Sequence, residues 1–247
     1  MKKSEKIVRR TVVILCEFVT AATIVTAILQ KQSAERILLA FATAALIFVP
    51  LCVERLFHCK LALPVYVFAV VYSIGSMLGS VNGLYYRLPG WDKVLHAAGG
   101  VMFVIVGYFL FELLGGDCKK NLRLAVLFAL CFSMAISVAW EFYEFAADRL
   151  FGMDMQADSF VTAIHSYQLG DAAGETGSID RVESVVINGE RMPWDGYMDI
   201  GLHDTMTDML LETLGAAAMA GIYLFDKGRH PMIRSAGTIT RKKKDLP

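Results

Sequence analysis

The segment LRLAVLFALCFSMAISVAWEFYEFA, residues 122–146, decides the fold class of this chain. Its apolar run is long enough to cross the hydrocarbon core of a bilayer, which takes about 20 helical residues at ~1.5 Å per residue. Apolar runs of similar length occur at roughly 11–30, 36–56, 62–83, 95–114 and 204–225. We therefore predict an all-α fold, a polytopic transmembrane helical bundle with about six spans.

The overall composition agrees with a membrane protein. Hydrophobic residues make up 55% of the 247 residues, and the mean hydropathy is +0.49. An ordinary soluble domain is less apolar than this. The basic start followed by an apolar run is also typical of a signal peptide. The apolar run is longer than a usual signal sequence and a second span follows at once, which favours an uncleaved first helix.

Basic residues are distributed unevenly between the two sides of the predicted bundle. Residues 2–10 carry five Lys or Arg, residues 55–60 two, residues 119–123 three and residues 227–244 seven, so that 17 of the 24 lie on one side. The positive-inside rule places both termini in the cytoplasm. The expected organisation is spans one to five in 1–147, an acidic extracytoplasmic cap loop in 148–203, the sixth span in 204–226 and a basic cytoplasmic tail in 227–247.

The segment between the fifth and sixth spans is acidic. Residues 148–204 carry eleven acidic and three basic side chains, a net formal charge near −8. Within it, residues 185–192 read VVINGERM, and the central Asn188-Gly189 pair is a strong hairpin signal. We expect a small outward cap containing a β-hairpin. Its negative field favours cations and disfavours nucleic acid.

Six ionisable side chains lie at the predicted outer ends of the last three spans. The members of each pair are three or four residues apart, so they share one face of a helix. The pairs are Asp92 with His96, Glu141 with Glu144, and Asp204 with Asp208. Five carboxylates cannot all ionise at close range without a cation or shared protons.

A divalent metal ion would supply this compensation most directly. Carboxylates and an imidazole suit Mg, Mn, Fe or Zn, and helical bundles build dimetal centres from paired acids on adjacent helices. All six residues are therefore candidate ligands of a divalent metal ion. A carboxylate that does not bind the ion could act as a general base, and Glu144 is our candidate.

Each of these residues also has a structural explanation. Asp92 and Asp204 could cap helix N-termini, and His96 could be a core histidine bonded to a carbonyl. The Glu pair could form salt bridges with Arg149 at the membrane interface. These explanations stay open beside the metal site.

Asp208 lies one turn deeper than the start of the sixth span, and Glu212 continues the same stripe. Eight helical residues place Glu212 roughly 12 Å below Asp204. This column could form a proton path, or Glu212 could pair with another buried polar group.

Three blocks of the sequence carry a family resemblance. They are Trp91-Asp-Lys-Val-Leu-His96, Trp140-Glu-Phe-Tyr-Glu144, and the stretch from Gly201 to Gly215 that contains Asp204-Thr-Met-Thr-Asp208. These blocks and their order along the chain resemble the YjdF-like family of bacterial inner-membrane proteins. The resemblance covers about residues 60 to 225. More remotely, Asp92-Lys-x-x-His96 is similar to VanZ-like proteins, some of which are linked to glycopeptide-antibiotic tolerance. The resemblance implies a polytopic protein of the bacterial plasma (inner) membrane and supplies no reaction.

Three functions follow as hypotheses. The first is a metal site that acts on a lipid-linked or envelope substrate, where the ion polarises a phosphoryl or carbonyl oxygen. The second is a cation- or proton-coupled transporter with Asp208 and Glu212 as relay steps, although no inverted repeat is evident. The third is a structural polar cluster that fixes helix register. The lipid bilayer is the expected partner, and the sequence leaves enzyme status and oligomeric state open.

Overall fold

The predicted membrane spans are present as helices. The structure is a computed structural model, and it describes residues 3–226. Within this range, six helical segments are long and apolar enough to cross a membrane, and small two-stranded sheets accompany them, which confirms the predicted fold class. The predicted basic tail, 227–247, lies outside the described residues. The spans are Lys3–Leu29, Ala34–Leu56, Leu63–Ser80, Trp91–Leu113, Leu122–Phe151 and Leu202–Phe225.

Two of the spans are broken into shorter helices. The second span breaks just before Pro50, whose ring and missing N–H prevent a continuous helix through that point. The third span breaks at Ile74, directly before Gly75. In chain order the helices are α1 (Lys3–Leu29), α2 (Ala34–Leu46), α3 (Val49–Leu56), α4 (Leu63–Ser73), α5 (Gly75–Ser80), α6 (Leu84–Arg87), α7 (Trp91–Leu113), α8 (Leu122–Phe151) and α9 (Leu202–Phe225).

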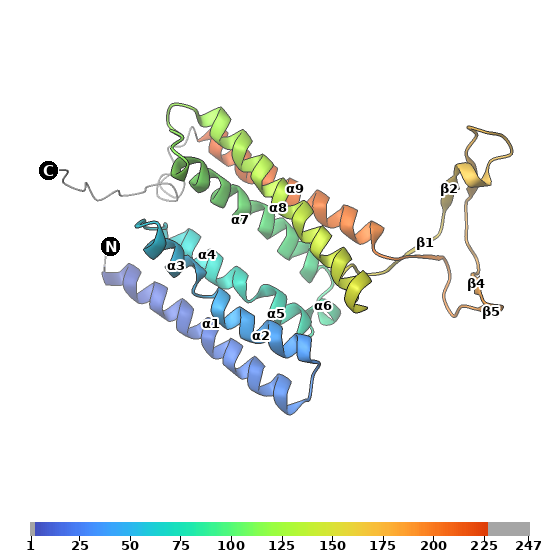
Figure 1. Ribbon diagram of the computed structural model, residues 1–247, viewed down its shortest axis with the longest axis horizontal. Helices are drawn as coiled ribbons and strands as arrows, with labels where there is room; N and C mark the ends of the chain where they lie inside the picture. Colours follow the sequence, from blue (N-terminus) through green and yellow to red (C-terminus); the bar gives the residue numbers. More distant parts are fainter. Residues whose placement is uncertain (1–2, 227–247) are drawn as a thin grey trace. The chain divides into compact units, whose positions relative to one another are not determined.

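The described residues form two compact units, and the larger one comprises residues 3–137 and 211–226. In its described part, α1 packs beside α2 and α4 (Figure 1). A second apolar cluster joins α7 to the N-terminal half of α8 and the C-terminal half of α9. Tyr108 of α7 stacks on Tyr223 of α9 there, with ring centroids 4.3 Å apart. This unit therefore holds α7 and the end of α9 side by side.

The smaller unit, residues 138–210, contains the C-terminal half of α8, a segment with short strands, and the first turns of α9. The predicted hairpin at 185–192 is present: Asn188 and Gly189 have φ angles of 53° and 87°, as a type I′ turn requires. The antiparallel pairs are β1 (Ser159–Val161) with β6 (Tyr197–Asp199), β2 (Ile164–Ser166) with β3 (Gly177–Ile179), and β4 (Val186–Ile187) with β5 (Glu190–Arg191). A single 3-10 turn, η1 (Tyr167–Leu169), follows β2.

Candidate functional site

The backbones of α7 and α9 are in contact where two glycines face them. A Cβ atom added to Gly100 would lie 2.0 Å from the carbonyl oxygen of Glu212, and one added to Gly215 would lie 2.1 Å from the carbonyl oxygen of Ala97. No real Cβ atom fits at such distances, so both positions require glycine. Small residues at a crossing allow membrane helices to approach this closely. The crossing fixes the position of His96, one turn from Gly100, relative to Glu212.

The first turns of α7 are also tied to the third span. The indole Nε1 of Trp91 donates a hydrogen bond to the carbonyl oxygen of Gly75 at 3.1 Å. The hydroxyl of Tyr72 donates to the carbonyl oxygen of Leu95 at 3.3 Å. These bonds connect α7 to α5 and α4 on either side of the Ile74 break. The predicted Asp-His pair therefore lies on a turn that neighbouring helices hold in place.

His96 is buried, with 7% of its surface exposed, and its ring lies between two carboxylates. Nε2 is 3.6 Å from Oδ1 of Asp92, one turn earlier on α7. Nδ1 is 3.8 Å from Oε2 of Glu212 on α9. Both distances exceed the usual hydrogen-bond range of about 2.7–3.2 Å. Each imidazole nitrogen therefore has a carboxylate nearby, slightly farther away than in a hydrogen bond.

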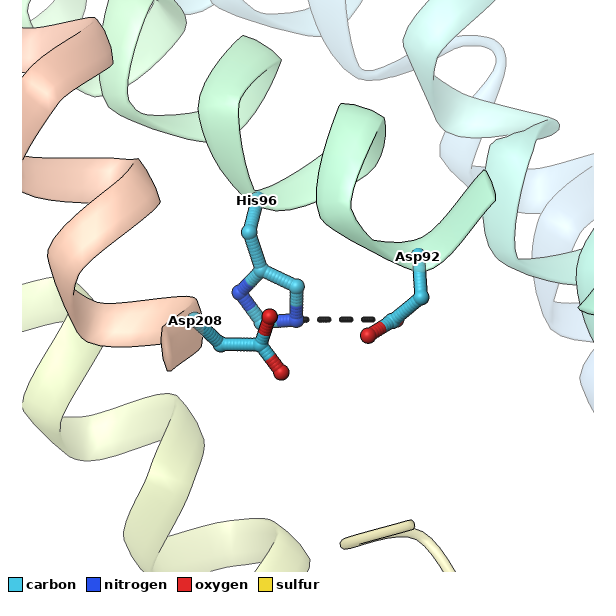
Figure 2. Close-up of side chains that lie close together, drawn as sticks. All are labelled: Asp92, His96 and Asp208. Carbon is cyan, nitrogen blue, oxygen red and sulfur yellow. Dashed lines mark ion pairs between the residues drawn. The ribbon is translucent and has the colours of Figure 1, made fainter. Parts of the chain in front are cut away.

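Asp208 lies one helical turn before Glu212 on α9 and is fully buried. One ligand atom each from Asp92, His96 and Asp208 lie within 4.8 Å of one another. Figure 2 shows the three side chains turned toward one another, with a dashed line for the pair between His96 and Asp92. Of the predicted ligands, the structure brings these three together.

The spacing of this group can be compared with the size of common ions. Two ligand atoms on opposite sides of Mg²⁺ are about 4.0–4.2 Å apart, and on opposite sides of Ca²⁺ about 4.6–5.2 Å. The ligand atoms of the group lie within 4.8 Å of one another, so none of their separations exceeds the Ca²⁺ range. Two carboxylates and an imidazole can therefore coordinate a divalent cation here after small side-chain rotations.

One basic side chain contributes to the charge balance of the group. Nζ of Lys93 is 3.3 Å from Oδ2 of Asp92, and both side chains are about one-third exposed. Asp92 is thus the most accessible member of the group, with Lys93 beside it. Asp208 and Glu212 lie deeper, because less than a twentieth of the surface of each is exposed.

The three other predicted site residues are buried in the smaller unit. Glu141, Glu144 and Asp204 are 4–7% exposed. Oε1 of Glu144 accepts a hydrogen bond from the Trp140 indole at 2.8 Å. Oδ2 of Asp204 accepts one from the backbone N–H of Ala157 at 2.9 Å. Within residues 3–226, they lie outside the group whose ligand atoms are within 4.8 Å of one another.

The start of α9 has its own anchoring contacts. Asp199 accepts a hydrogen bond from the backbone N–H of His203 at 2.6 Å, so it satisfies a donor of the first turn. Gln156 donates a side-chain hydrogen bond to the hydroxyl of Thr205. Together with the bond from Ala157 to Asp204, these contacts attach the loop after α8 to the first turn of α9. The carboxylate of Asp204 thus holds this loop.

The same loop concentrates negative charge. The carboxylate of Asp148 accepts hydrogen bonds from the backbone N–H groups of Met155 at 2.7 Å and Gln156 at 3.0 Å. Partial desolvation, and then the nearby carboxylates of Asp158, Asp148 and Asp204, raise the pKa of Asp154 above its usual value. Four of the eleven acidic residues of segment 148–204 therefore lie near one another close to the start of α9.

Two neighbours of the site were not assigned to it from the sequence. Glu212 was expected on a deeper stripe, and the structure places it against the second nitrogen of His96. Its spacing of four residues from Asp208 was a signal for this. Lys93 was treated as part of a motif, although its position next to Asp92 already indicated a local ion pair. The close crossing at Gly100 could not be assigned because the sequence does not show which helix faces it.

Comparison with known proteins identifies one family. The sequence model described as "Predicted membrane protein (DUF2238)" matches residues 11–228. No curated protein matches the chain, and no solved structure matches it.

Proposed function

The chain belongs to the DUF2238 family of predicted membrane proteins, and we propose that it binds a divalent cation through Asp92, His96 and Asp208. The observation that carries this proposal is the convergence of the three ligand atoms within 4.8 Å, in a place where His96 and Asp208 are buried. The family match covers all three residues. As a finer part of this proposal, we place the chain among the YjdF-like proteins that its three sequence blocks resemble.

Electrostatics supports a cation at this position. An ionised carboxylate within a membrane-spanning helix costs about 2.5–3.5 kcal/mol even on permissive scales, and the cost falls when a cation neutralises it. The group contains two carboxylates, Asp92 and Asp208, and Glu212 adds a third beside His96, whereas Lys93 offers one fixed positive charge. A divalent cation would balance the remaining negative charge.

The arrangement around His96 resembles the outer shell of metal sites. A ligating histidine usually binds the ion through one nitrogen and donates its other N–H to a carboxylate, which fixes the ring. Nε2 of His96 faces Asp92, and Nδ1 faces Glu212. We assign Nε2 as the ligand atom and Glu212 as the positioning residue.

The donor set narrows the choice of ion. Oxygen and imidazole ligands suit Mg, Mn, Fe or Zn, and the spacing also admits Ca. The described cysteines, at 16, 52, 59, 118 and 131, are not in the group, so a soft-metal thiolate site is not part of the proposal. Glu141, Glu144 and Asp204 are kept as further ligands in a wider site.

The predicted orientation of the site extends the proposal to metal-assisted chemistry on an envelope substrate. With both termini in the cytoplasm of a bacterium, the site would face outward. The ion could then polarise a phosphoryl or carbonyl oxygen of a lipid-linked or envelope substrate. If Glu144, which already accepts a hydrogen bond from Trp140, does not bind the ion, it would serve as the general base.

Metal analysis tests the proposal. Purified wild-type protein should retain a stoichiometric amount of one divalent metal by inductively coupled plasma mass spectrometry. Asp92→Asn and Asp208→Asn should each lower the affinity for that metal by at least about tenfold, because each removes a charged ligand. Asp171→Asn changes an exposed acid of the cap and should leave the metal content unchanged. Equal, negligible metal in all four proteins would refute the site.

A transporter is the second candidate function. It is favoured by the buried column of Asp208 and Glu212 beside His96, since intramembrane ionisable chains often carry protons or ions. Vesicles that contain the wild-type protein should then show pH-dependent uptake of Mn²⁺. If the wild type binds metal but shows no uptake in such vesicles, the transport candidate is discarded and the metal site stands.

A further inference from the structure

A second polar site lies in the larger unit, away from the metal group. A cavity of about 440 Å³ opens between α1, the second span and the start of α4. It is lined by five basic side chains and one acidic side chain, Glu54, a net formal charge of +4. The basic residues are Lys6, Arg9, Arg10, Arg55 and Lys60.

A buried ion pair forms the floor of this cavity. Nη1 of Arg9 donates to Oε1 of Glu54 at 2.6 Å, and the Arg9 guanidinium also lies 4.4 Å from the centroid of the Tyr66 ring. Glu54 accepts further hydrogen bonds from Nζ of Lys60 at 2.8 Å and from the backbone N–H of Leu61 at 2.9 Å. Both carboxylate oxygens of Glu54, the acidic residue of the cavity, therefore already accept hydrogen bonds from the protein.

Three cations of the cavity remain available for a ligand. Lys6, Arg10 and Arg55 are exposed. Within the part of the chain that the structure describes, they make no ion pair or side-chain hydrogen bond. Their charges lie on two different helices around one opening. Such an arrangement fits a phosphate group, which arginine and lysine bind through charge-assisted hydrogen bonds.

The remaining wall of the cavity is apolar. Val13 and Ile14 continue α1 from its basic end, and Phe48 and Leu51 line the facing span. Ile14 and Phe48 are substantially exposed, on helices of membrane-spanning length. A ligand that fills both parts needs a phosphate at the basic end and an alkyl chain along the apolar wall.

We propose that this cavity binds the headgroup phosphate of an anionic phospholipid, with an acyl chain along Ile14 and Phe48. Basic pockets between membrane helices bind anionic headgroups in this way, and each nearby cation strengthens the attraction. The buried pair of Arg9 and Glu54 keeps α1 and the second span at the required spacing.

Native mass spectrometry of the full-length protein with phosphatidylglycerol or phosphatidylcholine tests the proposal. The triple variant Lys6→Gln, Arg10→Gln, Arg55→Gln spares the ion pair. It should bind phosphatidylglycerol roughly 100-fold more weakly, because each removed cation accounts for about a fivefold change. The single variant Arg10→Gln should show about a fivefold loss, and it is the reference if the triple variant does not fold.

A matched variant controls for general attraction between charges. Lys119→Gln, Lys120→Gln, Arg123→Gln removes three exposed cations near the loop between α7 and α8, at the same end of the bundle because successive spans alternate in direction. This variant should bind phosphatidylglycerol like the wild type. Equal losses in both triple variants, or equal binding of phosphatidylcholine by the wild type, would overturn the proposal.

Inorganic phosphate distinguishes a lipid from a soluble anion. If the ligand is a phospholipid, millimolar phosphate should not displace bound phosphatidylglycerol, because phosphate cannot occupy the apolar wall. Complete displacement by phosphate would show that the cavity binds a soluble anion and would overturn the lipid assignment.

Discussion

His96 is the residue on which the proposed metal site depends most. Its two ring nitrogens face carboxylates on different helices, Asp92 on α7 and Glu212 on α9. A neutral imidazole can donate from only one nitrogen, so the two edges have different roles. If Nε2 binds the cation together with Asp92, then the proton is on Nδ1 and points to Glu212. The two carboxylates would thus differ in function, although both lie at similar distances from the ring.

Replacement of Glu212 by Gln tests this assignment. The variant should retain a metal site but with an affinity about 10- to 100-fold lower, which is the usual effect when an outer partner of a ligating histidine is lost. Isothermal titration with Mn²⁺ would measure the change. Glu212→Asp, which keeps the charge on a shorter chain, should recover part of the affinity.

Two results would contradict the positioning role of Glu212. If Glu212→Gln abolishes metal binding as completely as Asp208→Asn does, then Glu212 is itself a ligand. If Glu212→Gln leaves the affinity unchanged, Nδ1 of His96 does not depend on it, and the positioning role is wrong.

Among the helices, α7 and α9 form the pair that carries the site. Their crossing is tight because Gly100 and Gly215 each face a backbone carbonyl of the other helix. Below the crossing, Tyr108 stacks on Tyr223, which adds a second contact between the same helices. The site residues lie at the end of this pair where α7 begins.

Addition of one methyl group to α9 tests the importance of the crossing. Gly215→Ala places a Cβ atom 2.1 Å from the carbonyl oxygen of Ala97, so the helices must separate. We expect it to lower the free energy of unfolding by about 1–3 kcal/mol, as overpacking does, and to weaken metal binding. Thermal unfolding in detergent and metal analysis would measure both effects.

Gly221→Ala is the matched control on the same helix. A Cβ atom at Gly221 meets no atom within 4 Å, and alanine favours a helix over glycine by about 1 kcal/mol. The control should therefore be as stable as the wild type or more stable. If both variants unfold at the same temperature, the tight crossing does not contribute to stability.

Apolar segment length was sufficient to predict the helices, but not how they pack. Residues 122–146 indicated a span, because a backbone in lipid must satisfy its own hydrogen bonds, and Asn188-Gly189 indicated the hairpin because of its turn geometry. The Asp92 and His96 pair followed from helical spacing. The contact of His96 with Glu212 did not, since it depends on which faces of α7 and α9 meet at Gly100. The ends of the helices also differed, as α1 already begins at Lys3.

For the whole molecule, charge and span order together predict which ends of the helices face the cytoplasm. If each span crosses the membrane once, the basic segments before the first span, after the second and after the fourth are predicted at one face. The acidic segment between α8 and α9 is predicted at the other. The proposed metal site and the proposed lipid cavity then belong to opposite faces. Their separation means that each proposal can fail without the other.

Cysteine labelling in intact cells tests this orientation. In a variant with its five native cysteines replaced, Ala172→Cys in the exposed cap should react with a membrane-impermeant maleimide. Lys120→Cys, exposed between α7 and α8, should react only after the cells are permeabilised. The reverse pattern would invert the topology and place the metal group toward the cytoplasm.

The backbone contact between α7 and α9 also bears on which ions could be selected. Two main chains that already touch at Gly100 and Gly215 cannot move closer, so Asp92 and Asp208 can approach a small ion only by rotating their own side chains. The crossing therefore sets a minimum distance between α7 and α9. In the proposed site it would penalise contraction around Mg²⁺ and tolerate the longer bonds of Ca²⁺, which differ by about 0.3–0.5 Å.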